Sequence, residues 1–75
     1  MKAQEQLGMR IKYLRKKLRW SQEDLALNAD INKNYISDLE NGRRNPSLDI
    51  LERIAIAFNI SLEELFKGIE TIPGI

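Results

Sequence analysis

The chain contains neither cysteine nor histidine, and both absences narrow what it can do. Without cysteine there is no disulfide framework and no thiolate site for a metal ion. Without histidine the commonest general base and the commonest zinc ligand are missing, which excludes a hydrolase triad of serine, histidine and aspartate. No glycine-rich loop that cradles phosphates is present either. We therefore expect a protein that is not an enzyme and that holds no metal and no cofactor.

Turn-forming and aromatic residues are also scarce: the 75 residues include 2 Pro, 4 Gly and 7% aromatic residues. An all-β domain needs many turns, so this composition favours helices. The longest unbroken apolar run covers residues 54–58, too short to span a membrane, and the N-terminus lacks the apolar core of a signal peptide. We expect one all-α domain over residues 1–75, located in the cytoplasm and without a membrane partner.

Charge is distributed unevenly, although the net charge is only +1. Residues 1–44 hold ten Lys or Arg and six Asp or Glu, whereas residues 45–75 hold two basic and five acidic residues. The first part is suited to a polyanion, and the second part would be repelled by one. Solvated surface charges that are spread unevenly by chance give the same totals, so charge alone leaves both interpretations open.

Apolar spacing and capping signals predict five helices, at residues 4–18, 22–28, 33–41, 48–58 and 62–67. The domain core is expected over residues 4–67, followed by an apolar tail at 68–75. Four polar residues supply the predicted N-caps of helices two to five: Ser21, Asn32, Ser47 and Ser61. Two inward-facing stripes are predicted on the first and fourth helices: Leu7, Ile11, Leu14 and Leu18, and Leu48, Leu51, Ile54, Ala55 and Phe58.

The second and third predicted helices are separated by only a few residues. So short a turn forces them to cross steeply, as in a helix-turn-helix. The crossing needs a small residue at the contact, and Ala26 fits. It also needs an apolar plug from each side, which Leu25 and Ile36 supply. The other three helices are then expected to buttress this pair in one small domain.

Several segments in order resemble the Cro/C1-type helix-turn-helix family of phage repressors: WSQEDLA at 20–26, NYIS at 34–37, LENGRRNPSL at 39–48 and SLEEL at 61–65. The resemblance covers residues 7–67. It implies a compact five-helix lambda-repressor-like DNA-binding domain and a sequence-specific transcription regulator. The short chain further resembles the controller proteins of restriction–modification systems, which implies control of its own gene and of a restriction–modification gene. Arg19 and Asp30 stand where the family usually has glycine, so both positions are expected to need φ above zero.

The third helix is the candidate recognition helix, which enters the major groove of double-stranded DNA through its N-terminal residues. Lys33, Asn34 and Ser37 lie on the face away from the core and are expected to contact bases. Lys33 can donate to guanine and Asn34 can pair with adenine. For Asp38, on the same helix, an ordinary solvated carboxylate is the better explanation.

The expected phosphate contacts are Gln22, Tyr35, Asn41, Arg43, Arg44 and Asn45. The N–H groups of the first turn around Gln22 favour an anion, and the resemblance implies contacts from the side chains of Gln22 and Asn41. A packing role for Tyr35 and a solvated basic pair at Arg43 and Arg44 are the alternatives. The resemblance also implies a structural ion pair, Arg15 with Glu40, that links the first helix to the end of the third.

A single recognition helix reads only about four to six base pairs, so a homodimer on a near-palindromic operator is expected. The expected dimer interface comprises Ile60, Leu62, Phe66 and Ile69. The alternative is that the apolar residues of the last helix only close the core of one chain. No ligand-sensing domain fits in this length, so no small-molecule ligand is expected. The competing function is a protein-interaction module, an antitoxin or coregulator, that uses the helix-turn-helix as a scaffold.

Overall fold

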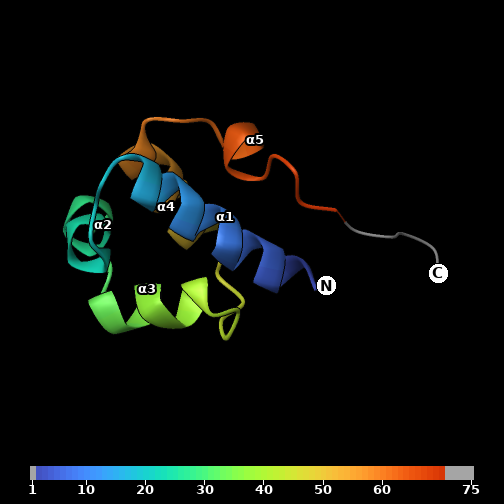
Figure 1. Cartoon of the computed structure of the whole chain (residues 1–75), viewed down its shortest axis with the longest axis horizontal. Helices are drawn as coiled ribbons and strands as arrows, with labels where there is room; N and C mark the ends of the chain where they lie inside the picture. Colours follow the sequence, from blue (N-terminus) through green and yellow to red (C-terminus); the bar gives the residue numbers. More distant parts are fainter. Residues whose placement is uncertain (1, 71–75) are drawn as a thin grey trace.

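The computed structural model describes residues 2–70, which form five helices and no strand within that range (Figure 1). The helices are α1 (Ala3–Lys17), α2 (Gln22–Ala29), α3 (Lys33–Glu40), α4 (Leu48–Phe58) and α5 (Leu62–Leu65). Helix α1 runs through the middle of the molecule, with α3 along one side and α4 behind it (Figure 1). The predicted all-α fold with five helices is confirmed. None of the helices in residues 2–70 is long and apolar enough to cross a membrane.

Helices α2 to α5 begin where the sequence predicts, because a polar side chain caps each of them. The Ser21 hydroxyl accepts a hydrogen bond from the N–H of Asp24 at 3.0 Å, and the Asp24 carboxylate accepts from the N–H of Ser21 at 2.8 Å. The shorter aspartate therefore closes a capping box that usually carries glutamate. At the start of α3, Oδ1 of Asn32 accepts from the N–H of Asn34 at 2.7 Å.

Two turns adopt the left-handed conformation that the sequence predicts. Arg19, after α1, has φ 60°, and Asp30, between α2 and α3, has φ 55°. Each costs on the order of 1 kcal/mol relative to glycine, because a Cβ atom crowds the backbone there. Asn59 ends α4 in the same conformation, with φ 58°. These three turns fix where the neighbouring helices end and in which direction the chain leaves.

The core joins all five helices around three aliphatic side chains of the α2–α3 pair. Leu25, Ile36 and Leu39 have no exposed surface. Leu65 of α5 is equally buried and closes the core from the far side. The ring of Trp20, at the junction of α1 and α2, stacks on Phe58 with centroids 5.8 Å apart.

Two residues of the predicted core and the end of one predicted helix are wrong. Leu18 is 47% exposed because α1 ends at Lys17, and the chain turns away before the stripe is complete. Leu48 is 67% exposed because it is the first residue of α4. Helix α5 ends at Leu65 and not at residue 67, since the chain turns there and Gly68 adopts φ 83°. Of the predicted apolar tail, residues 71–75 lie outside the described part of the chain.

Candidate nucleic-acid interface

The turn between α2 and α3 sets the angle of the candidate recognition helix. The N–H of Ile31 donates to the carbonyl oxygen of Ala26 at 3.0 Å, directly after the left-handed Asp30. Ala26 is only 6% exposed, so its small side chain lets the two helices approach closely. Because Ile36 and Leu39 are completely buried on the inner side of α3, the opposite side of the helix must face outward.

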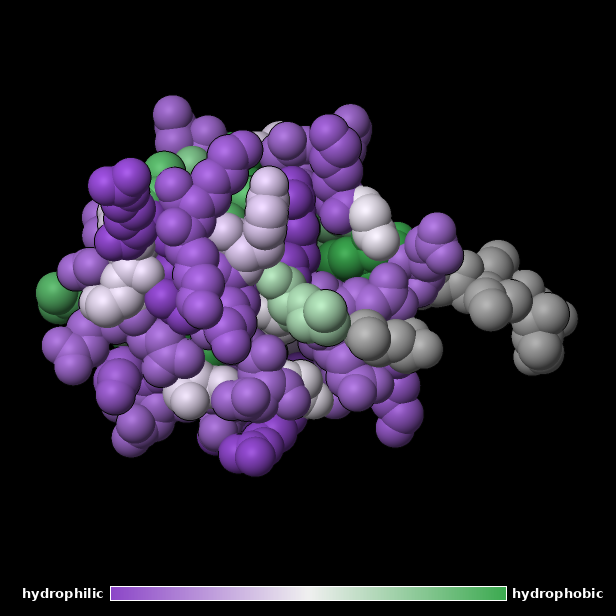
Figure 2. Space-filling model, viewed as in Figure 1, coloured by the Kyte–Doolittle hydropathy of each residue, from purple (hydrophilic) through white to green (hydrophobic). Residues whose placement is uncertain are grey.

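The outer side of α3 carries the three predicted base-contacting residues. Lys33 and Asn34 are exposed in the first turn, and Ser37 is half-buried one turn later. Figure 2 shows mainly hydrophilic side chains over the lower part of the molecule, where α3 lies in Figure 1. The structure therefore brings these three residues to one exposed polar surface on a helix of eight residues.

The loop after α3 presents most of the predicted phosphate-contacting residues. Gly42 adopts φ 72° and turns the chain back, so that the N–H of Arg43 donates to the carbonyl oxygen of Asp38 at 2.9 Å. The Gln4 amide of α1 donates to the carbonyl oxygen of Gly42 at 2.8 Å and ties the loop to the core. Four polar side chains are exposed along this loop: Asn41, Arg43, Arg44 and Asn45.

One of these side chains is already engaged with α3. The guanidinium of Arg44 lies over the ring of Tyr35, with its central carbon 5.0 Å from the ring centroid. Its Nε and Nη2 atoms each donate to Oδ2 of Asp38 at 3.3 Å. Tyr35 is half-buried, so its ring both packs on the core and supports the arginine. No local sequence pattern predicts this cluster of Tyr35, Asp38 and Arg44, because it depends on how the loop folds back onto α3.

Gln22 lies in the first turn of α2, as predicted, but its side chain points inward. Its amide Nε2 donates to Oε1 of Glu40 at 3.2 Å, and the residue is half-buried. The contact connects the start of α2 to the end of α3. A phosphate contact from this side chain would therefore have to coexist with the bond to Glu40 or replace it.

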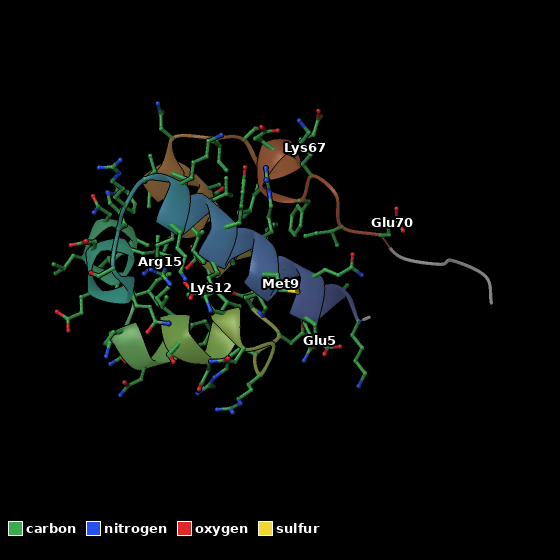
Figure 3. All side chains as sticks on the ribbon, viewed as in Figure 1. Glu5, Met9, Lys12, Arg15, Lys67 and Glu70 are labelled. Atoms are coloured by element: carbon green, nitrogen blue, oxygen red, sulfur yellow. The ribbon has the colours of Figure 1, made fainter. Side chains whose placement is uncertain are left out.

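Arg15 and Glu40 form a buried ion pair where α1, α2 and α3 meet (Figure 3). Nε and Nη2 of Arg15 donate to the two carboxylate oxygens of Glu40 at 2.7 and 2.9 Å, and Nη1 donates to the carbonyl oxygen of Trp20 at 2.7 Å. The side chains are 9% and 2% exposed. The hydrogen bonds to Glu40 raise the pKa of Arg15, burial opposes this, and the charge of Glu40 raises it further. The pair holds the end of α3 against α1.

A glycine that the sequence analysis did not use brings α1 and α3 still closer. A Cβ atom on Gly8 would lie 2.4 Å from the carbonyl oxygen of Leu39 and 2.7 Å from that of Glu40. The backbones therefore touch at a distance that no other residue permits. The available signal was a lone glycine inside a predicted amphipathic helix, which often marks a close backbone approach.

The residues predicted for a dimer interface lie on α5 and beside it. Ile60, Leu62 and Ile69 are half-buried against the core of the same chain, and Phe66 is 37% exposed. Two further apolar residues are exposed on α1 and were not predicted to lie at the surface: Met9, 57% exposed, and Tyr13, 56% exposed. Their spacing of four residues was the available signal. These two residues and Ile69 line one shallow hollow beside the chain that follows α5.

Known proteins resemble this chain in both sequence and fold. A helix-turn-helix family model matches residues 11–65. The chain is 47% identical over 64 residues to the control protein C.MunI from Mycoplasma sp, which covers 84% of this chain and 86% of that protein. Its fold is similar to the restriction-modification controller protein C.AhdI from Aeromonas hydrophila, with a TM-score of 0.79, 34% identity, and coverage of 81% of this chain and 92% of that chain. It is also similar to C.Esp1396I bound to a 25 base pair operator site, with a TM-score of 0.82, 28% identity, and coverage of 92% and 91%.

Proposed function

This chain belongs to the Cro/C1-type helix-turn-helix family, and we propose that it regulates transcription by binding operator DNA in a sequence-specific way. The observation that carries the proposal is the two-sided character of α3. Its inner side is fixed by buried apolar side chains and by Glu40, while its outer side is polar and exposed. A helix held in this way fits the major groove as a rigid unit.

Base recognition is assigned to two exposed residues of α3, Lys33 and Asn34, and to the half-buried Ser37. Lys33 donates to O6 and N7 of guanine, and Asn34 pairs with N6 and N7 of adenine. Ser37, one turn further along, donates or accepts at the next base edge. Their short spacing within the first two turns supports this assignment, because the N-terminal part of a recognition helix reaches deepest into the groove.

Phosphate contacts are assigned to residues that flank α3. On one side, the backbone N–H groups of the first turn of α2, at Gln22, face the anionic backbone, and the helix dipole favours an anion there. On the other side lie Tyr35 and the exposed loop residues Asn41, Arg43, Arg44 and Asn45. Phosphate contacts on both sides of α3 fix the depth of the helix in the groove and its angle to the DNA. Such contacts position the protein and do not themselves read the base sequence.

The protein acts as a homodimer in this proposal. Two recognition helices then lie about 34 Å apart and read the two halves of a near-palindromic site. The assigned interface is the α5 end of the molecule, with Ile60, Leu62, Phe66 and Ile69. Three acidic residues at this end of the molecule, Glu63, Glu64 and Glu70, support this placement, because an interface there keeps their carboxylates away from the DNA phosphates.

The similarity to C.MunI and C.AhdI supports a role in controlling restriction–modification genes, including the gene of the regulator itself. Such a regulator shares a compartment with DNA, so we place the protein in the cytoplasm. No catalysis is needed, because a dimer bound near a promoter either blocks polymerase or recruits it. We assign no cofactor and no small-molecule ligand to this role.

The salt dependence of DNA binding tests the proposal against the scaffold alternative. If a dimer engages six to ten phosphates, the plot of log K against log salt concentration falls with a slope of about −5 to −9. The experiment is a titration of a fluorescent duplex at several salt concentrations. A flat response, together with weak binding at low salt, would contradict the proposal and favour an antitoxin or coregulator module.

A further inference from the structure

Asp38 places a carboxylate on the outer side of α3. Binding of this side to a polyanion does not explain why a negative charge is there. Of the two acidic residues of α3, Glu40 is buried with Arg15, whereas the side chain of Asp38 is 35% exposed. DNA phosphates repel a carboxylate at this position whatever the base sequence. An exposed ion pair such as that between Asp38 and Arg44 contributes little to folding stability, so stability does not account for it either.

The geometry around Asp38 indicates what the carboxylate does. The carbonyl oxygen of Asp38 accepts hydrogen bonds from the N–H groups of Asn41 and Arg43 at 3.2 and 2.9 Å, which fold the loop back onto α3. The side chain of Asp38 then holds Nε and Nη2 of Arg44, while the ring of Tyr35 supports the guanidinium plane. Among residues 2–70, only Nε and Nη2 of the Arg44 guanidinium donate hydrogen bonds, and Nη1 does not. The arginine is therefore oriented before DNA is present, with part of its donor capacity unused.

We propose that Asp38 is a specificity-determining residue that acts by positioning Arg44. This inference rests on the proposed function. On the operator, base contacts fix the register of α3, so the oriented guanidinium meets its phosphate at a small ordering cost, which offsets the repulsion of the carboxylate. On DNA without matching bases, α3 is not held in one register. The orientation then gives no benefit, while the repulsion is still present.

The test compares Asp38→Asn with the wild-type protein on two probes of equal length. One is a duplex selected by the wild-type protein from a random-sequence pool, and the other is a mixed-sequence duplex without that site. We expect Asp38→Asn to bind the mixed duplex about threefold more tightly and the selected duplex no more tightly. The ratio of the two affinities then falls about three- to tenfold. Glu52→Gln removes the same charge from exposed α4 and should leave the ratio unchanged.

A second experiment distinguishes two ways in which Asp38 could act: by positioning Arg44, or by contacting a base directly. In an Arg44→Ala protein, Asp38→Asn should raise both affinities alike, because the residue through which Asp38 acts is gone. A lowered ratio in that background would overturn the inference, and so would an unchanged ratio in the wild-type background. Thermal unfolding should show all variants equally folded, since both side chains are exposed. A wild-type protein that binds both duplexes equally would contradict the proposed function itself.

Discussion

Helix α3 has polar contacts on both sides, and the two sides differ in burial. Toward α1, Arg15 and Glu40 are almost completely buried and all three nitrogens of the Arg15 guanidinium donate hydrogen bonds. Toward solvent, Lys33 and Asn34 are exposed, and Arg44 is held by a half-exposed pair with hydrogen bonds of 3.3 Å. Similar polar chemistry therefore serves two purposes on this helix. Buried polar contacts position the helix, and exposed ones are available for a partner.

The energetic consequences of the two sides should differ accordingly. Removing one member of a buried pair leaves an uncompensated charge in the core, which is strongly destabilising. Removing an exposed charge changes folding little but changes binding to a charged partner. Folding stability should therefore depend mainly on the buried contacts, and DNA affinity mainly on the exposed ones.

The largest expected effect is on the buried side. Arg15→Ala should lower the free energy of unfolding by about 3–5 kcal/mol, because the Glu40 carboxylate loses its partner within the core. Chemical denaturation of both proteins measures this. Asp49→Asn is the matched control, since it alters an exposed ion pair with Arg53 and should cost less than about 1 kcal/mol. Equal losses from the two variants would refute the distinction between the sides.

The close contact between α1 and α3 gives the next effect. Gly8→Ala should lower the free energy of unfolding by about 1–3 kcal/mol, because the new Cβ atom would overlap two carbonyl oxygens of α3 and force the helices apart. Unfolding of Gly68→Ala is the comparison, because no atom lies within 4 Å of that position and only its φ of 83° opposes alanine. That control should cost about 1 kcal/mol. If Gly8→Ala costs no more than Gly68→Ala, the contact does not set the helix position.

On the exposed side, Lys33→Ala should leave stability within about 0.5 kcal/mol of wild type. Its affinity for the operator should fall by about 1–3 kcal/mol per half-site, with relaxed preference at one base position in each half, because each subunit loses a specific base contact. Binding to a set of operators with single base changes measures both quantities. A uniform loss over the whole set would instead assign Lys33 to a phosphate.

The smallest effect is expected in the loop. Arg43→Ala should weaken binding to all duplexes alike and reduce the magnitude of the salt slope by about 2, since the dimer loses one phosphate contact from each subunit. Titrations at several salt concentrations give the slope. A change in base preference with an unchanged slope would show that Arg43 reads sequence.

Local signals in the sequence predict much of the fold, since caps and turns depend on neighbouring residues. The starts of α2 to α5 and the left-handed turns at Arg19 and Asp30 follow from such signals. Periodicity alone does not show where a helix leaves the core, and for that reason it wrongly predicts that Leu18 and Leu48 are buried.

The sequence predicts which residues of the candidate site are exposed, but not which of them contact one another. The sequence places Lys33 and Asn34 on the outer side of α3 because the apolar positions occupy the inner side. It does not show that Gln22 turns inward to Glu40, or that Asp38 holds Arg44. Those contacts depend on how separate segments approach each other, which no local pattern encodes.

Recovery of bound duplexes from a random-sequence pool shows whether α3 reads DNA bases in each subunit of a dimer. If α3 reads DNA as part of a dimer, the enriched duplexes should share two related half-sites in inverted orientation, about one helical turn apart. Lys33→Ala should then alter one position in each half. A pool that emerges from selection with no shared sequence would contradict the account.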